Sequence, residues 1–474
     1  MKNTIKMIKK KLGLSKDYIY KEIIVDKTSV YLIFSEVLTS GDNVNEYILK
    51  RLITLSKKEL KKLENYLPTN NITKISKEEI TDYINKGFVI CLVNKDIYAI
   101  EIRASLERGI TTIESELSVN GPKDSFSENF NTNLGLIRRR IKSDNLWWDE
   151  VNLGDSSKTK IGVLYMKDIV NDNLPKAVID RLNKIDIDGI IDSNYLKDEL
   201  ESDNNSFFPT IMSTERPDKV AMALLEGKVA ILVDMSSYIL ILPNFFIDYF
   251  KTCDDYYQKS INTTFIRVIR IFAFFISIFI PAYYIAVTTY NHDAIQLPLL
   301  LLLKAQRMSV PFPAVVEALF MIISFEILRE SDIRMSSTTG SAISILGGII
   351  LGDAAVSAGI MSPIMIIIIA LSSIAGFVFT SIELVNAIRM YRIIFLFLAC
   401  TLGLYGIYLG AVYLLYKLIT IKSFDKPYLA PFSPFIKTEF KDAIVKAKNK
   451  GKKYRNPLLS KNKLRGVYKW KNYL

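Results

Sequence analysis

The sequence has few of the residues from which catalytic and metal sites are most often built. His292 is the only histidine among 474 residues, and the three cysteines, Cys91, Cys253 and Cys400, are far apart. Without a CxxC pair, neither a disulfide framework nor a cysteine metal site is implied. A lone histidine disfavours a zinc site and leaves Ser–His catalysis only if His292 is the base. We therefore expect no metal and no other cofactor.

Motifs that position a phosphate or a nucleophile are also absent. The sequence contains no GxxxxGK[ST], no GxGxxG and no GxSxG. These patterns mark phosphate-binding loops, dinucleotide-binding folds and hydrolase nucleophiles. An intramembrane enzyme therefore has little to be built from, and we expect that the protein is not an enzyme.

Hydrophobic residues are distributed very unevenly along the chain. Overall, 50% of residues are hydrophobic and 23% are charged. Residues up to about 255 are rich in Lys, Asn, Asp and Glu, whereas residues 265–420 are mostly Ile, Leu, Phe, Ala and Gly. No secretory signal opens the chain, since the basic start MKNTIKMIKKKLGLSK lacks a following apolar core. We predict a cytosolic N-terminal region joined to a polytopic helical membrane domain.

The polar region predicts an α/β fold in two subdomains, residues 1–120 and 121–260. In the first, residues 30–38 read as a strand, 45–67 as a helix, and 88–94 with 97–103 as a hairpin. In the second, residues 160–166 and 228–234 read as strands and 174–185 as a helix. Strands alternating with helices favour a mixed sheet covered by helices.

The apolar region, residues 265–420, contains segments of different lengths. Residues 271–290 can cross about 30 Å of hydrocarbon, and Arg267 and Arg270 before them indicate that the N-terminal region lies inside. Residues 294–303 are too short to span and predict a re-entrant or interfacial segment. The further apolar segments are 315–334, 341–361, 362–382 and 393–416.

The topology of the last segment is contradictory. Arg389 and Arg392 before it and the basic tail after it, residues 421–474, all favour the inner side of the membrane. One straight span would place them on opposite sides, unless some segment is re-entrant. From residue 437 onward, the tail has thirteen Lys or Arg against Glu439 and Asp442. We therefore expect the tail inside, either as a solvated tail or bound to anionic lipids, and not to nucleic acid.

Acidic residues inside the segment 315–334 are the first candidates for function. A carboxylate within hydrocarbon is costly and usually functional. On a helix, Ser324 lies near the face of Glu317, whereas Glu326 points about half a turn away and shares its face with Arg329 and Glu330. Each glutamate can line an ion pathway or a subunit interface, or can join neighbouring helices by hydrogen bonds and ion pairs.

The next segment carries small residues at helical spacing. Such stripes allow close approach of two helices, within one chain or between subunits around a pore. Asp353 borders the stripe and could face water. His292, where the first span ends, is either an interfacial polar cap or a pH-sensing or gating group. The stripe consists of Ser344, Gly348, Gly352, Ala355 and Gly359.

Several motifs of this chain occur together in one known family. They are His292 after the first span, Arg307 followed by VPFP and Glu317, the FEILRE run from Phe325, the Gly/Ala-rich run ending in SP at Pro363, and SFDKPYLAPFSP from Ser423. ESELSVNGPKDSFSENFNTNLGLIRRRIK, FFPTIMSTERPD and LLEGKVAILVD add to them. In these residues the chain resembles the A subunits of GerA-type germinant receptors of bacterial endospores, from about residue 25 to 457.

The resemblance implies a receptor in the inner membrane of dormant spores. Its partners would be a transporter-like B subunit that binds the nutrient and a lipoprotein C subunit. The A subunit would have a two-part cytosolic domain and a membrane domain that forms a ring around an ion pathway. Residues of the GPKDSFSENFNTNLGLIRRR and TERPD motifs are then candidates for assembly: Glu128, Asn133, Arg138, Arg139, Arg140, Glu215, Arg216 and Asp218.

The chain departs from the family pattern in three turns. Asp293 directly follows His292, Met335-Ser336-Ser337 stands where Leu-Pro is usual, and Met235-Ser236-Ser237 replaces Gly-x-Pro. The leading hypothesis is a subunit of a nutrient-gated cation channel. The alternatives are a non-conducting scaffold that relays a signal from the B subunit, and the related paralogue encoded with the SpoVA proteins.

Overall fold

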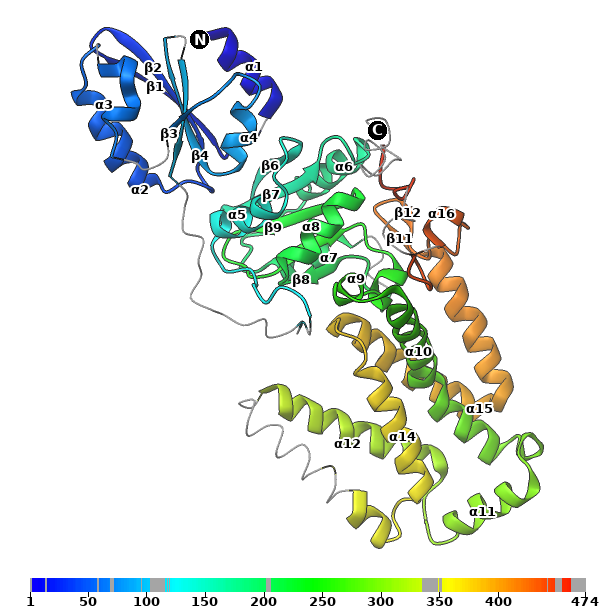
Figure 1. Ribbon diagram of the computed structural model, residues 1–474. Coiled ribbons are helices and arrows are strands. Elements are labelled where there is room, and N and C mark those ends of the chain that lie inside the picture. The colour runs from blue at the N-terminus through cyan, green and yellow to red at the C-terminus, as the bar shows by residue number, and fades with distance from the viewer. Residues whose placement is uncertain are drawn as a thin grey trace.

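Two α/β subdomains and a group of helices follow one another along the chain in the computed structural model (Figure 1). The structure describes residues 2–12, 15–57, 59–68, 72–94, 96–102, 116, 118, 120–201, 206–334, 348, 352–440, 442–447 and 454–461. The predicted order, an α/β N-terminal region followed by helices, is confirmed.

The first subdomain is a five-stranded sheet with the order β1-β2-β4-β5-β3. Its apolar residues form a separate core on each face, because helices cover both sides. The strands are β1 (Tyr18–Val25), β2 (Thr28–Ser35), β3 (Ile72–Lys74), β4 (Phe88–Val93) and β5 (Asp96–Glu101). The helices are α1 (Lys2–Leu12), α2 (Gly41–Asn43), η1 (Val44–Leu49), α3 (Lys50–Thr54), η2 (Glu59–Asn65) and α4 (Ile80–Asn85).

The second subdomain repeats this plan with the strand order β6-β7-β9-β10-β8. One face packs on α6 and α7, and the core of the other face continues into the long helices and the C-terminal segment. The strands are β6 (Leu146–Leu153), β7 (Thr159–Met166), β8 (Met212–Thr214), β9 (Val229–Val233) and β10 (Ile239–Leu242). The helices are α5 (Phe130–Arg140), α6 (Asn173–Leu182), α7 (Ser193–Leu200), α8 (Pro217–Glu226), η3 (Phe246–Phe250) and α9 (Asp254–Tyr257).

The prediction of a mixed sheet is wrong, because every strand pair described in these two sheets is antiparallel. Four of the pairs are hairpins of consecutive strands: β1–β2, β4–β5, β6–β7 and β9–β10. The helices lie in the longer connections between these hairpins, so no parallel pair is needed. The hairpin of β4 and β5 is confirmed, and Asn94 takes the left-handed φ of 52° that a glycine would usually supply. The helix predicted over 45–67 is interrupted after Thr54 and resumes as the 3₁₀ helix η2.

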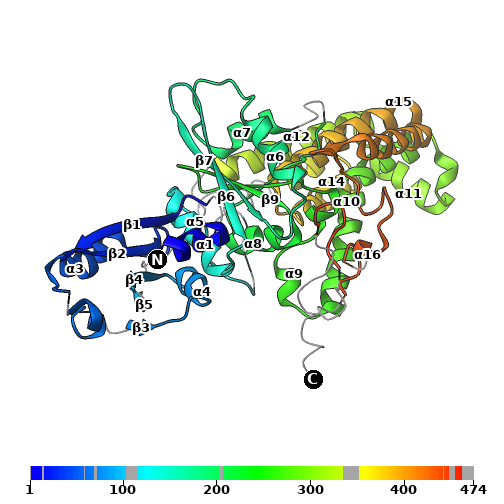
Figure 2. The ribbon, with the colours of Figure 1, turned by 90° about the horizontal axis from the view of Figure 1, so that it is seen from above.

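In the helical part, α10, α14 and α15 lie side by side (Figures 1 and 2). Two helices, α10 and α15, are long and apolar enough to cross a membrane. The predicted span 362–382 forms a helix of only 14 residues. Within the segment 341–361, residues 341–347 and 349–351 lie outside the described residues. The helices are α10 (Ser260–Thr289), η4 (His292–Ala294), α11 (Leu297–Arg307), α12 (Ala314–Arg334), α14 (Pro363–Gly376) and α15 (Ile382–Thr420).

Helix α15 is not the single straight span predicted from residues 393–416, because it reverses direction at Gly403. Gly403 has φ 60° and ψ −141°, a conformation that only glycine adopts readily. A Cβ on Gly410 would lie 2.7 Å from Phe395 Cε1, although fifteen helical residues normally span about 22 Å. The two arms are therefore antiparallel, and the start and end of α15 lie at the same end of the helical part.

The C-terminal segment, described over residues 421–440, 442–447 and 454–461, packs on the second subdomain. It contains β11 (Lys422–Ser423), β12 (Lys426–Pro427) and α16 (Lys437–Phe440). Tyr428 is fully buried, and Ser460 forms a β-bridge with Val170. The prediction of a solvated tail is therefore wrong for these residues, because hydrophobic and hydroxyl side chains fix the segment to the subdomain.

Candidate functional site

Glu317 joins three segments of the helical part. Its side chain is fully buried in the first turn of α12. Oε2 accepts hydrogen bonds from the backbone N and the Oγ of Ser362, at 3.0 and 2.9 Å. Ser362 is the N-cap of α14, so the glutamate satisfies a free donor at that helix end. Oε1 lies 3.4 Å from Arg307 Nε at the end of α11.

Glu326 faces a different neighbour, as the helical geometry predicted. Its Oε2 lies 3.1 Å from Nε of Arg389 on α15. The Glu326 side chain is 34% exposed, in contrast to the sealed Glu317. A cavity of about 30 Å³ adjoins this pair and is also lined by Arg329 and Arg392. The two glutamates thus belong to separate charge clusters, one in the first turn of α12 and one just beyond its middle.

Arg392 is buried, and among the described residues no carboxylate lies at hydrogen-bond distance from it. Its Nε donates to the backbone carbonyl of Ser277 on α10 at 3.0 Å, and Nη2 donates to that of Ser372 on α14 at 3.3 Å. Within a helix, the Ser277 carbonyl would accept from residue 281. That residue is Pro281, which has no N–H, so the carbonyl is free for Arg392. Arg392 therefore ties α15 to both other helices.

The remaining pathway candidates lie nearer the surface. Glu330 is exposed and forms an ion pair with Arg334 one turn away. The Arg329 guanidinium lies 5.6 Å from the ring centre of Phe377. Two others, Ser324 and His292, are half-buried, and Asp353 is exposed.

Two of the four described residues of the small-residue stripe make no close contact within the described chain. A Cβ at Gly348 or Gly352 would meet no atom within 4 Å among the residues described. Ala355 is buried, Gly359 adopts φ 65° beside the Ser309 carbonyl, and Ser344 lies outside the described residues. The predicted helix contact within one chain is thus not seen at the two glycines.

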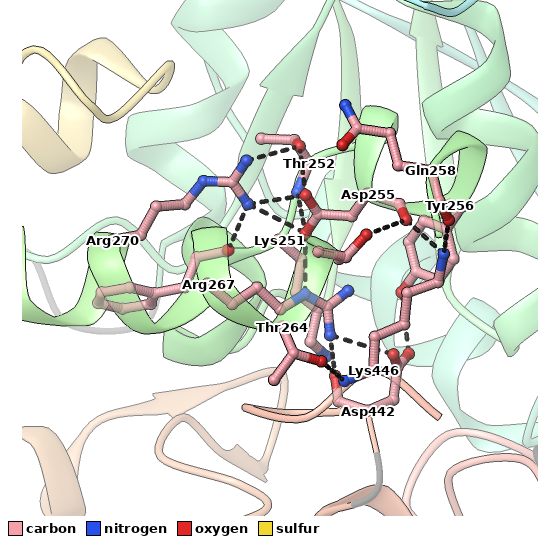
Figure 3. Close-up of polar contacts among 12 residues, drawn as sticks. Lys251, Thr252, Asp255, Tyr256, Gln258, Thr264, Arg267, Arg270, Asp442 and Lys446 are labelled. Atoms are coloured by element: carbon pink, nitrogen blue, oxygen red, sulfur yellow. Dashed lines mark hydrogen bonds and ion pairs between the residues drawn. The ribbon is translucent and has the colours of Figure 1, made fainter. Parts of the chain in front are cut away.

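The start of α10 carries the densest polar cluster, which we name the junction cluster (Figure 3). Asp255 accepts from Arg267 Nε at 2.8 Å and from Arg270 Nη1 at 2.9 and 3.0 Å. Arg267 is fully buried, and Arg270 also donates to the carbonyl of Phe250 at 3.0 Å. Two arginines that the sequence presents as membrane-flanking cations are therefore fixed to the second subdomain.

The C-terminal segment completes the junction cluster. Asp442 accepts from Arg267 Nη1 through its carbonyl at 2.8 Å and its carboxylate at 3.1 Å. Lys446 is almost fully buried and donates to the backbone carbonyls of Asp255 and Gln258. Arg267 thus joins the end of the second subdomain to the C-terminal segment, which is far away in sequence. Sequence reasoning missed Asp255, Asp442 and Lys446, because single charged residues in polar stretches give no signal.

Arg138 is the best-defined of the assembly candidates. It is buried and pairs with Asp17 of the first subdomain at 2.7 Å. Asp17 also accepts from Trp148 Nε1 at 3.0 Å, and the Arg138 guanidinium stacks over Tyr18. This arginine therefore joins the two subdomains of its own chain.

Arg216 and Asp218 of the TERPD motif likewise bind within the chain. Arg216 donates to both carboxylate oxygens of Asp218, at 3.0 and 2.7 Å, and Tyr257 OH donates to Asp218 at 2.8 Å. Burial would raise the pKa of Asp218, but the bonds from Arg216 and Tyr257 outweigh it and lower that pKa. The motif thereby fixes α8 to the segment that leads into α10.

The other assembly candidates in these motifs either bind groups within the chain or are exposed. Asn133 is buried and accepts from the Ser127 backbone N at 2.7 Å, and Arg140 binds Asp124. Glu215 is buried and accepts from the Glu116 backbone N at 3.1 Å. Glu128 and Arg139 have exposed side chains and remain available to another chain.

Comparisons with known proteins agree over most of the chain. A family model described as Bacillus/Clostridium GerA spore germination protein matches residues 6–458. The chain is 36% identical over 451 residues to spore germination protein KA of Bacillus subtilis (strain 168), covering 92% of this chain and 82% of that protein. It is 32% identical over 424 residues to the uncharacterized membrane protein YfkQ of the same organism, covering 88% and 83%. The crystal structure of the N-terminal domain of the A subunit of the Bacillus megaterium spore germinant receptor GerK3 aligns with a TM-score of 0.41 and 26% identity, over 51% of this chain and 94% of that one.

Proposed function

The chain belongs to the GerA family of Bacillus and Clostridium spore germination proteins, and from this premise we propose that it is the A subunit of a nutrient germinant receptor in the inner spore membrane. In this proposal the helical part oligomerises around a cation pathway that opens when a partner subunit binds the nutrient. No step of this proposal is catalytic.

The main support for the channel proposal is the second half of α12, which is charged and partly exposed. The buried side chains of this helix are Ala314, Glu317, Ala318, Met321 and Ile322, all in its first half. The second half presents Glu326, Arg329 and Glu330 on a partly exposed surface. Charged groups in a membrane face water, protein or each other rather than lipid. A ring of such helices would supply both a subunit interface and a polar pathway.

The arrangement of the helix ends supports a topology with both termini inside. The base of α10 lies beside the second subdomain through the junction cluster. The start of α15 does so through Glu383, which pairs with Lys197, and its end through the following Ser423, whose Oγ donates to the Thr210 carbonyl at 2.7 Å. At the opposite end, Tyr290 OH donates to the Cys400 carbonyl and Leu404 N donates to Asn291 Oδ1. The hairpin at Gly403 removes the conflict between Arg389, Arg392 and the C-terminal segment, because all three can lie on the spore-core side.

Reconstitution tests conduction directly. The chain would be purified with its co-encoded B and C subunits and placed in planar bilayers, where nutrient should evoke a cation current. Glu326→Gln should change cation selectivity, because its carboxylate is partly exposed, whereas sealed Glu317 should affect stability rather than selectivity. Assemblies that contain all three subunits, bind nutrient and remain impermeable to monovalent cations contradict the channel.

A non-conducting scaffold is the second candidate, and the sealed environment of Glu317 favours it. That carboxylate caps α14 and pairs with Arg307, which is the behaviour of a group that holds helices together. Under this hypothesis Glu326→Gln leaves ion flux unchanged and lowers the recovery of the other subunits. Co-purification of the variant separates the two candidates, and the identity of the recovered chains separates a germinant receptor from the SpoVA-linked paralogue.

A further inference from the structure

The cavity beside Glu326 is lined by more positive than negative charge. Three guanidinium groups, those of Arg329, Arg389 and Arg392, surround it, and Glu326 supplies the only carboxylate among its lining residues. The formal charge of the lining is therefore positive by two. Excess charge in a region of low dielectric is costly unless an ion of opposite sign compensates it.

The arginines retain unused hydrogen-bonding capacity. Nε of Arg389 is buried and has no hydrogen-bond partner, although it lies 3.1 Å from Glu326 Oε2. Arg392 uses Nε and Nη2 on backbone carbonyls, and no carboxylate neutralises it directly. Arg329 contacts the ring of Phe377 through its guanidinium face. Planar guanidinium groups bind phosphate and carboxylate oxygens through paired donors.

The size and position of the cavity restrict the ligand. About 30 Å³ admits one or two oxygen atoms rather than a whole metabolite. Tyr391, next to Arg392, stacks on Phe208 of the second subdomain, so the cavity lies at that end of the helical part. Phe377, which lines the cavity, is 62% exposed. The arginines and the exposed phenylalanine together fit a ligand that has anionic oxygens next to an apolar part.

We propose that this cavity binds the phosphate of an anionic phospholipid from the leaflet on the side of the second subdomain. The phosphate oxygens compensate the three arginines, and the acyl chains pack on the exposed apolar surface that includes Phe377. This lipid site is distinct from the basic C-terminal segment, in which Lys446 and Lys461 already bind groups of the same chain. The inference rests on the proposed membrane location.

Native mass spectrometry of the full-length chain in detergent tests the site, with phosphatidylglycerol and phosphatidylcholine as the two probes. Phosphatidylglycerol should bind more tightly. Arg389→Gln and Arg329→Gln should each weaken it about fivefold, since one cation near a membrane surface contributes about 1 kcal/mol. Glu326→Gln should strengthen it, because the only carboxylate is removed. A variant that merely misfolds would not gain a preference for phosphatidylglycerol over phosphatidylcholine.

Arg334→Gln is the matched control, because Arg334 lies on the same helix, is 77% exposed and pairs with Glu330. Equal affinity for the two lipids, or equal losses in Arg389→Gln and Arg334→Gln, overturns the proposal. Inorganic phosphate, added to the chain in phosphatidylcholine nanodiscs, should raise the melting temperature less than phosphatidylglycerol does. An equal rise overturns the lipid assignment. The proposal is also overturned if Arg389→Gln loses a co-purified subunit without any change in lipid binding. In that case Arg389 binds a carboxylate of the partner subunit rather than a lipid phosphate.

Flotation with liposomes after an alkaline wash separates this inference from the proposed function. A chain that stays with the liposomes but shows no lipid preference contradicts the lipid site alone. A chain released by the wash contradicts the membrane location on which both depend.

Discussion

Arg392 donates a hydrogen bond from Nε to the backbone carbonyl of Ser277 across 3.0 Å, and this bond depends on a proline four residues further along α10. Because Pro281 has no N–H, the carbonyl has no partner within its own helix. The arginine and Ser372 Oγ, at 2.8 Å, both use this free acceptor. A break in one helix thus becomes a contact point for two others.

A double-mutant cycle tests this relationship. Arg392→Met should destabilise the chain by about 2–3 kcal/mol, because buried carbonyls lose a charged donor. Pro281→Ala restores an N–H that can bond to the Ser277 carbonyl, so the double variant should lose less than the sum of the two single losses, by about 1 kcal/mol. Thermal unfolding in detergent measures all four proteins. Strict additivity would show that the two side chains do not share the carbonyl.

Gly403→Ala should prevent formation of the α15 hairpin. The left-handed φ disfavours any side chain, and the new Cβ would lie 2.6 Å from Asn291 Oδ1. We expect loss of monodisperse protein in size-exclusion chromatography. Gly348→Ala is the control, since a Cβ there meets no described atom within 4 Å. A hairpin-forming, monodisperse Gly403→Ala protein would disprove the fold-back.

Apolar runs and strand patterns in the sequence predicted much of this architecture. Apolar runs located α10 and α12, and the β4–β5 hairpin was found from its two strands. Strand β1 was missed because its turn, Asp26-Lys27, has two left-handed residues without the Gly or Asn that usually marks it. The reversal at Gly403 was missed because one glycine in an apolar run resembles any other glycine of a membrane helix.

The sequence predicted how the glutamates of the candidate site are arranged on their helix, but not which residues they contact. Helical spacing correctly separated Glu317 from Glu326, because both lie on one element. Their partners Arg307, Ser362 and Arg389 lie on other elements, so only the tertiary structure identifies them. The same holds for the junction cluster, where residues 187 positions apart, Asp255 and Asp442, bind the same arginine.

Asp255→Asn should be the most damaging single change in the junction cluster. It removes the carboxylate that pairs with both Arg267 and Arg270, although Arg267 keeps its ion pair with Asp442. Breaking a buried ion pair typically costs about 3–5 kcal/mol. We expect a large fall in melting temperature and faster proteolysis of the C-terminal segment. Asp155→Asn, on an exposed turn of the second subdomain, is the matched control. Equal stability of the two variants would show that the junction cluster does not hold α10 and the C-terminal segment on the second subdomain.

Asp248 should make the stability of the second subdomain depend on pH. Burial alone would raise its pKa, but Lys228 at 2.6 Å and Lys251 at 3.4 Å hold that pKa well below its ordinary value. A depressed pKa stabilises the fold above the unfolded value of about 3.9, and this contribution is lost as the pH falls below it. The wild-type chain should therefore exceed Asp248→Asn in melting temperature at pH 7, and the difference should shrink towards pH 3. Glu128→Gln, at an exposed site, is the control and should differ little from the wild-type chain at pH 7.

Arg307 and Glu317 should behave as one ion pair, with unequal costs for removing either partner. Arg307→Gln leaves a fully buried carboxylate without its cation, whereas Glu317→Gln leaves a partly exposed arginine and keeps an acceptor for Ser362. We therefore expect a loss of about 3–5 kcal/mol in the first variant and a smaller one in the second. The double variant should be more stable than Arg307→Gln alone, because Glu317→Gln removes the uncompensated charge. Thermal unfolding of the four proteins measures this rescue, and its absence would mean that Glu317 carries no charge in the folded chain and holds α14 through hydrogen bonds only.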